Sequence, residues 1–180
     1  MTWTTATTDG RREARRAVET FEVDAPVDQS SWSSQRIRAY AARHELDARP
    51  LAVLRIPRLK LSVPVLDGID DAVLDRGAGH IPETARPGEP GNIGIAAHRD
   101  SFFRGLKDVK AGDEIELATR RGRERYVVER TWIVDPEDLS VLEPTPTPAM
   151  TLVTCYPFYY IGSAPHRFIV RAVRAEDEIR

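Results

Sequence analysis

Short apolar runs broken by proline and glycine dominate the chain from Leu51 onward. Each run has the length of a β-strand, and runs of this length between turn residues indicate strands rather than helices. They cover residues 51–56, 62–66, 93–97, 113–118, a long β-rich stretch over 126–134, and residues 150–154 and 167–173. Seven or eight short strands with little helix between them predict a mainly all-β domain, either a closed barrel or a sandwich.

Prolines and glycines limit where these runs lie. A proline has no N–H to donate to a sheet, so Pro64 marks residues 62–66 as an edge or bulged strand. The three prolines in residues 144–148 exclude that segment from central sheet for the same reason. Residues 70–76 are predicted as a short helix that ends at Gly77.

Residues 1–50 follow a different pattern. Apolar positions between residues 14 and 21 recur at i, i+3, i+4 and i+7, which predicts a narrow amphipathic helix. A second helix, capped by Ser34, presents one face formed by Ile37, Tyr40, Ala41 and His44. We therefore expect an N-terminal helical appendage or linker over residues 1–50, a β domain over 51–175 and a tail over 176–180. The second helix is expected to dock on the domain, and residues 1–28 to fray.

Composition excludes several classes of function. A chain of 180 residues with 41% hydrophobic side chains is expected to fold as one domain. Its net charge of -2, without a basic block interleaved with aromatic residues, argues against a nucleic-acid partner. One cysteine and four scattered histidines predict no metal site, and no cofactor is expected. No apolar stretch approaches the roughly 18–20 residues of a membrane span, and no signal peptide is visible.

The lone Cys155 is the first candidate for chemistry. It follows an apolar strand and precedes Tyr156 and Pro157, where the chain leaves the sheet. A thiol at such a strand end is accessible and rigidly held, as a nucleophile requires. The alternative stays open, because an isolated cysteine is usually a small buried apolar side chain.

His98 and Arg167 also fall at strand ends. His98 ends the run 93–97, where a neutral imidazole suits proton transfer to or from a thiol or a leaving amine. Arg167 opens the last strand and offers several N–H donors to an oxyanion. Alternation puts Arg167 on one face with Ile169 and Arg171, and the core on the other with Phe168, Val170 and Ala172.

The other histidines are weaker candidates. His166 is a rival base, but alternation points it away from the face of Arg167. His80 is expected in a flexible loop with a structural or rim role, and His44 on the appendage. Together, Cys155, His98 and Arg167 form the set of nucleophile, base and electrostatic stabiliser that acyl transfer needs.

These residues resemble those of a known family. Residues 151–155, Thr-Leu-Val-Thr-Cys, resemble the T-L-x-T-C signature of sortases, and residues 97–104 resemble the sortase histidine segment. Arg167 falls where that family has its active-site arginine. Residues 154–162 and 164–170 are most similar to class D sortases, whereas class E members usually have a His-Pro pair after the cysteine.

The resemblance implies a closed, eight-stranded sortase β-barrel and a cysteine transpeptidase. Its substrate would be an LPxTG-like C-terminal sorting signal, and its second partner an amine acceptor. Cys155 would form an acyl-thioester, His98 would move protons and Arg167 would bind the oxyanion. Thr154 and Ala97 would belong to the substrate-binding site. The resemblance also implies an extracytoplasmic, membrane-associated enzyme, although the usual N-terminal apolar anchor is not visible.

Two alternatives remain at this point. The same scaffold with water as the acyl acceptor would be a hydrolytic cysteine peptidase. A β-barrel with an inert Cys155 would be a non-catalytic peptide-binding module.

Overall fold

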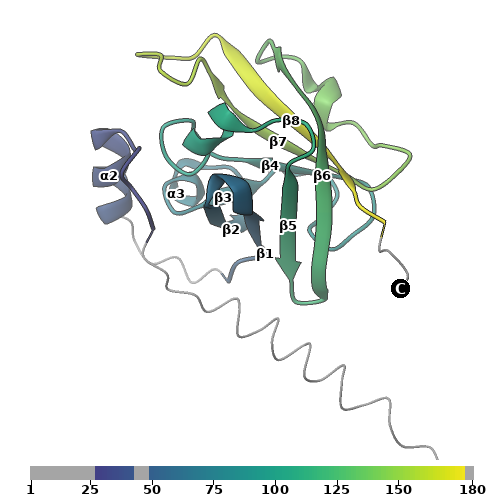
Figure 1. Ribbon diagram of the computed structural model, residues 1–180. Helices are drawn as coiled ribbons and strands as arrows, with labels where there is room; N and C mark the ends of the chain where they lie inside the picture. Colours follow the sequence, from purple (N-terminus) through teal and green to yellow (C-terminus); the bar gives the residue numbers. More distant parts are fainter. Residues whose placement is uncertain (1–26, 43–48, 177–180) are drawn as a thin grey trace, which may run out of the picture.

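A computed structural model describes residues 27–42 and 49–176. Eight strands form a closed barrel in the order β1-β2-β3-β4-β7-β8-β6-β5 (Figure 1), which confirms the predicted fold class. The strands are β1 (Ala52–Ile56), β2 (Leu61–Asp67), β3 (Ala78–His80), β4 (Asn92–Ala96), β5 (Glu114–Thr119), β6 (Gly122–Val134), β7 (Ala149–Tyr156) and β8 (His166–Arg174). The helices are α2 (Ser34–Ala41) and α3 (Asp71–Leu74), with 3-10 turns η1 (Pro57–Leu59), η2 (Arg104–Asp108) and η3 (Leu139–Leu142).

Two strand pairs are parallel and the others are antiparallel. β2 pairs with β3, and β4 pairs with β7, in the parallel sense. Parallel strands have their carboxyl ends at the same edge of a sheet. The residues that follow β4 and those that end β7 therefore meet at one end of the barrel.

The core fills the barrel interior with apolar side chains that alternate along the strands. Leu54, Ile95, Leu117 and Leu152 are fully buried there, and each such side chain contributes about 1.5–3 kcal/mol to folding. As predicted, Phe168, Val170 and Ala172 face this core.

The outer face of the β4-β7-β8 region is also covered, which the sequence did not predict. Ile169, expected to share an outer face with Arg167, is 0% exposed. The segment between β6 and β7 lies over this face: Asn92 Nδ2 and Arg171 Nη2 donate to the Val141 carbonyl oxygen at 3.1 and 3.0 Å. The cover comes from a connection distant in sequence, so alternation alone did not reveal it.

Two predictions about β2 and β3 are wrong. β2 is not an edge strand, because it pairs with β1 and β3. Pro64 is tolerated because β3 pairs only from Val65 onward, so β2 needs no donor toward β3 at the proline. His80 is not in a flexible loop but ends the short strand β3 and is 3% exposed.

The second appendage helix is present as α2, and its cap is Ser33 rather than Ser34. The Ser33 side chain accepts a hydrogen bond from the Arg36 backbone N–H. The helix docks on the barrel, because Trp32 and Tyr40 contact Phe102 edge-on, with ring centroids 4.7 and 6.0 Å apart. Ile37, expected to be covered by this docking, stays 38% exposed.

The helix predicted from the apolar positions between residues 14 and 21 lies outside the described residues, and so does His44. The same is true of the last four residues of the predicted tail.

Candidate functional site

The register of β4 and β7 brings the predicted base and nucleophile to neighbouring positions. Ala96 is the partner of Val153 in this parallel pair, and His98 and Cys155 each follow two residues later. Neighbouring strands lie about 4.8 Å apart. Cys155 lies within β7, one residue before its end, and not after the strand as predicted. Its side chain is partly exposed.

Thr154 and Ala97 join the two strand ends. The Ala97 N–H donates to the Val153 carbonyl oxygen at 3.3 Å. The Thr154 hydroxyl donates to the Ala97 carbonyl oxygen at 2.7 Å, and both residues are at least 95% buried. This bond fixes the residue before Cys155 to the residue before His98.

Arg167 lies directly opposite Cys155 in the antiparallel β7-β8 pair. Directly opposite residues in such a pair project to the same face. Nη1 of Arg167 donates to the carbonyl oxygens of Ala164 and His166 at 3.3 and 2.9 Å, which hold the guanidinium at the start of β8. Cys155, His98 and Arg167 thus come together at one end of the barrel, from three adjacent segments.

The imidazole of His98 is largely enclosed, with 16% of its side chain exposed. Its Nε2 atom is buried, makes no hydrogen bond to the described residues and lies 3.8 Å from Asp75 Oδ1. Burial lowers the pKa of His98, and the nearby Arg36 lowers it further, against the opposite effect of three carboxylates: Asp100, Asp75 and Asp71. The lowered pKa favours the neutral imidazole at pH 7.

Arg36 of α2 connects to two carboxylates near His98. Its Nε donates to Asp100 Oδ1 at 2.9 Å and its Nη1 to Asp75 Oδ1 at 3.4 Å, while the Ser33 hydroxyl donates to Asp100 Oδ2 at 2.7 Å. Burial raises the pKa of Asp100, but the hydrogen bonds from Ser33 and Arg36 outweigh it and the net pKa is below its ordinary value. The sequence analysis missed these contacts, because no local pattern joins residue 36 to residues 75 and 100.

Two arginines after His98 hold the connection between β7 and β8. Arg99 Nη2 donates to the carbonyl oxygens of Tyr160 and Gly162 at 2.8 and 3.0 Å. Arg104 Nη1 donates to the Phe158 carbonyl oxygen at 2.7 Å. The histidine segment and the segment after Cys155 are therefore joined a second time, outside the strand pairing.

Of the other histidines in the described residues, His80 lies away from this cluster, whereas His166 is next to Arg167 in β8 and its imidazole contacts Asp135 instead. His80 Nε2 is 2.9 Å from the Ala85 carbonyl oxygen and 3.1 Å from Thr84 Oγ1 inside the barrel wall, which fits the expected structural role. His166 Nδ1 is 3.4 Å from Asp135 Oδ1, and 45% of its side chain is exposed. Across residues 27–42 and 49–176, no three His, Cys, Asp or Glu side chains gather as metal ligands.

The sortase family model, described as a sortase domain, matches residues 54–175, about two thirds of the chain. The chain belongs to the sortase family. The sortase domain takes in most of β1 and all of β2 to β8, so it contains the Cys155, His98 and Arg167 cluster.

Known sortases resemble this chain in sequence and in structure. Sortase D of Bacillus subtilis (strain 168) is 35% identical over 123 residues, 68% of this chain, which confirms the resemblance to class D. The structure of Sortase E1 from Streptomyces coelicolor has a TM-score of 0.64 at 32% identity, over 71% of this chain and 88% of that one. The structure of Sortase A from Corynebacterium diphtheriae has a TM-score of 0.67 at 26% identity, over 94% of this chain and 85% of that one.

The chain spans 62% of the length of the Bacillus subtilis Sortase D that it matches. Within the described part of the chain, no helix has the length and apolar character needed to cross a membrane.

Proposed function

We propose that this chain is a cysteine transpeptidase that cleaves an LPxTG-like C-terminal sorting signal and transfers the acyl part to an amine. The observation that carries the proposal is the register of three adjacent segments. Cys155 is opposite Arg167 in the β7-β8 pair, and His98 follows β4 at the position that matches Cys155. Membership of the sortase family supports the same reading.

In the proposed first step, Cys155 Sγ attacks the carbonyl carbon of the threonine in the sorting signal. Neutral His98 accepts the thiol proton and passes it to the departing amine, so the C–N bond breaks and a thioester remains. The lowered pKa of His98 supports the role of proton acceptor. Arg167 lies on the face of Cys155 and would donate to the oxyanion as it forms.

In the second step, an amine attacks the thioester carbonyl and His98 takes a proton from it. The new amide forms as the C–S bond of the thioester breaks, and His98 passes the proton to the Cys155 thiolate, which regenerates the thiol. We propose that Thr154 and Ala97 serve the substrate site by holding the two strand ends in register through their 2.7 Å hydrogen bond. That Sortase E1 of Streptomyces coelicolor holds a tripeptide in its active site supports a peptide substrate.

The product of this reaction would be a protein anchored to the cell surface or joined into a pilus. We propose accordingly that the enzyme acts outside the cytoplasmic membrane and is associated with it, as its family implies. The substrate would be a secreted protein that carries the signal, and no cofactor enters the reaction.

Mass spectrometry of the protein with LPxTx-type peptides, with and without added amines, tests the proposal. We expect an adduct on Cys155 that hydroxylamine removes, and a ligated product when an amine is present. If water alone releases the peptide at the same rate with every amine, the protein is instead a hydrolytic cysteine peptidase. Peptide binding without an adduct or turnover would identify a non-catalytic binding module.

A further inference from the structure

A pocket of about 440 Å³ opens at the end of the barrel opposite Cys155. It is formed where β1 begins, where β5 turns into β6, and along the connection that precedes β4. His98 follows the other end of β4, so the five residues of that strand, at about 3.3 Å each, separate the two sites. The pocket is therefore distinct from the proposed active site.

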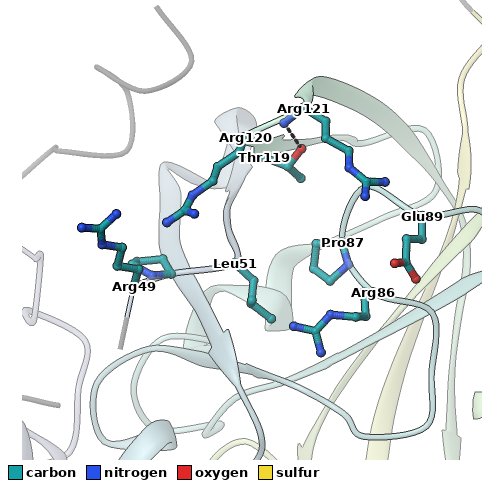
Figure 2. Close-up of a pocket in the computed structure, with 9 residues that line it drawn as sticks. Arg49, Leu51, Arg86, Pro87, Glu89, Thr119, Arg120 and Arg121 are labelled. Atoms are coloured by element: carbon teal, nitrogen blue, oxygen red, sulfur yellow. Dashed lines mark hydrogen bonds between the residues drawn. The ribbon is translucent and has the colours of Figure 1, made fainter. Parts of the chain in front are cut away.

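Four arginines surround this pocket, with one carboxylate among them (Figure 2): Arg49, Arg86, Arg120 and Arg121, and Glu89. Four positive charges against one negative charge leave a net charge of +3 at the pocket, whereas the whole chain carries -2. The residues around the pocket thus carry a net charge of opposite sign to that of the whole chain.

Among the residues that the structure describes, most of these guanidinium groups have no carboxylate partner. Within residues 27–42 and 49–176, Arg49, Arg120 and Arg121 form no ion pair, and Arg86 Nη2 lies 3.6 Å from Asp67 Oδ2. The next two arginines along the same β5-β6 hairpin differ. Arg123 and Arg125 lie 3.7 and 3.5 Å from Glu116 and Glu114. The hairpin arginines along the strand therefore face carboxylates, whereas Arg120 and Arg121 at the pocket have none among the described residues. Arg121 Nη1 donates to the Gly88 carbonyl oxygen at 3.5 Å.

The backbone that carries the arginines is well packed. The Arg121 N–H donates to Thr119 Oγ1 at 3.1 Å, which closes the turn between β5 and β6. Gly88 has a φ of +85°, and a Cβ there would lie 3.4 Å from Thr119 Oγ1, so the connection before β4 rests against this turn. Three segments far apart in sequence thus hold the guanidinium groups around one space.

We propose that this pocket binds a phosphate-bearing group. The planar guanidinium fork matches phosphate oxygens in two-point hydrogen bonds, and arginine is the side chain best suited to such recognition. Leu51 and Pro87 also line the pocket and provide apolar surface for the carbon atoms next to the phosphate. The volume falls within the range of small-ligand sites, which is about 300–1,000 Å³. A lipid headgroup and a soluble phosphate ester share this chemistry.

Two binding measurements on the full chain test the proposal and separate these sources. The first titrates inorganic phosphate and glycerol 3-phosphate while amide NMR shifts are recorded. The second measures sedimentation with vesicles of phosphatidylglycerol in phosphatidylcholine, against phosphatidylcholine alone. The test variant is Arg120→Gln with Arg121→Gln. The matched control, Arg123→Gln with Arg125→Gln, removes the same charge from the same hairpin.

We expect shifts confined to residues 86–89 and 119–121, and binding at least about tenfold weaker in the pocket variant, since two charged hydrogen-bonding groups are lost. The control should change binding by less than about twofold, because its arginines already have carboxylate partners. Binding of the soluble phosphates supports the pocket with a free ester as ligand, and binding only to phosphatidylglycerol vesicles supports it with a headgroup. Equal losses in both variants, or no binding by the parent in either measurement, would overturn the proposal. Peptide cleavage should be unchanged in both variants, so this result does not depend on the proposed catalysis.

Discussion

His98 lies between two parts of the molecule that are held in different ways. On one side, five consecutive residue pairs fix β4 against β7 through the backbone. On the other side, α2 and the residues just before it reach the same region mainly through side chains, with Arg36 on Asp100 and Trp32 on Phe102. One backbone hydrogen bond, from the Ser33 N–H to the Asp100 carbonyl oxygen at 3.1 Å, adds to these contacts. Strand register holds the barrel side in place, whereas the α2 side depends on a small number of contacts.

This difference separates two kinds of effect. Strand register survives most side-chain substitutions, so changes at Cys155 or Arg167 remove chemistry and leave the geometry in place. Arg36 and Asp100 are each about one fifth exposed, and neither is the proposed nucleophile, base or oxyanion donor. Changes on the α2 side should therefore adjust the charge around His98 and leave the reaction possible.

The largest effect is expected for Cys155→Ala. Turnover of a sorting peptide should be abolished, because the thioester cannot form without the thiol. Stability should change by less than about 1 kcal/mol, because the side chain is partly exposed and loses few contacts. Peptide cleavage assays and thermal unfolding measure the two quantities. Detectable turnover by the alanine variant would rule out Cys155 as the nucleophile.

The next effect is expected at the proposed base. His98→Ala should lower the rate by about a hundredfold or more, the usual contribution of general acid–base catalysis. His166→Ala is the control, because its imidazole faces Asp135 and is nearly half exposed; its loss should be far smaller. A larger loss for the His166 variant would reverse the assignment of the base.

Arg167→Lys tests whether geometry or charge matters on β8. Lysine keeps the positive charge but lacks the planar set of donors. We expect a loss of about 2.7–4 kcal/mol in transition-state stabilisation, as for removal of an oxyanion donor. Steady-state kinetics with a sorting peptide give this value. A lysine variant with a near-normal rate would mean that Arg167 acts through charge alone.

A smaller effect is expected where the strand ends are joined. Thr154→Val keeps the shape but leaves the Ala97 carbonyl without the 2.7 Å hydrogen bond, at a cost of about 1–3 kcal/mol in unfolding free energy. The control is Thr145→Val, since Thr145 donates to the Thr147 carbonyl at an exposed site and should cost much less. Chemical denaturation of the two variants measures both losses in unfolding free energy. Equal losses would mean that the buried Thr154 hydrogen bond stabilises the fold no more than an exposed one.

The barrel side of this comparison was largely predictable from sequence. Apolar runs predicted most of the strands, and alternation predicted the core face of β8. Both features depend on the local pattern of apolar residues. β3 was missed because its three residues follow Gly77, include Gly79 and carry no apolar pattern of their own. The burial of Ile169 was missed because its cover comes from a distant connection.

The α2 side was predictable only in outline. An apolar stripe predicted the helix and its docking. The structure has Ser33 as the cap, one residue before the predicted Ser34, and leaves Ile37 exposed. The contacts of Arg36 join residues separated by 39 and 64 positions. Local periodicity carries no information at that range, and arginine is common enough in this chain that none stands out.

Arg36→Gln is the substitution on the α2 side with the clearest expected sign. Burial is the main cause of the lowered pKa of His98, and Arg36 lowers it further by its positive charge. Removing that charge, and freeing Asp75 and Asp100 from it, should raise the pKa of His98 toward its ordinary value.

The sign of the pH effect follows from this shift. The neutral imidazole is the proton acceptor in the proposed mechanism, and with a higher pKa it becomes protonated at a higher pH. The acid side of the activity profile should therefore move to higher pH in Arg36→Gln, while the rate well above pH 7 stays nearly the same. Arg38→Gln is the matched control, because Arg38 is exposed on the same helix. NMR titration of the His98 ring protons measures the pKa directly. A pKa unchanged in Arg36→Gln, or moved equally in Arg38→Gln, would mean that α2 supports the site without setting its charge.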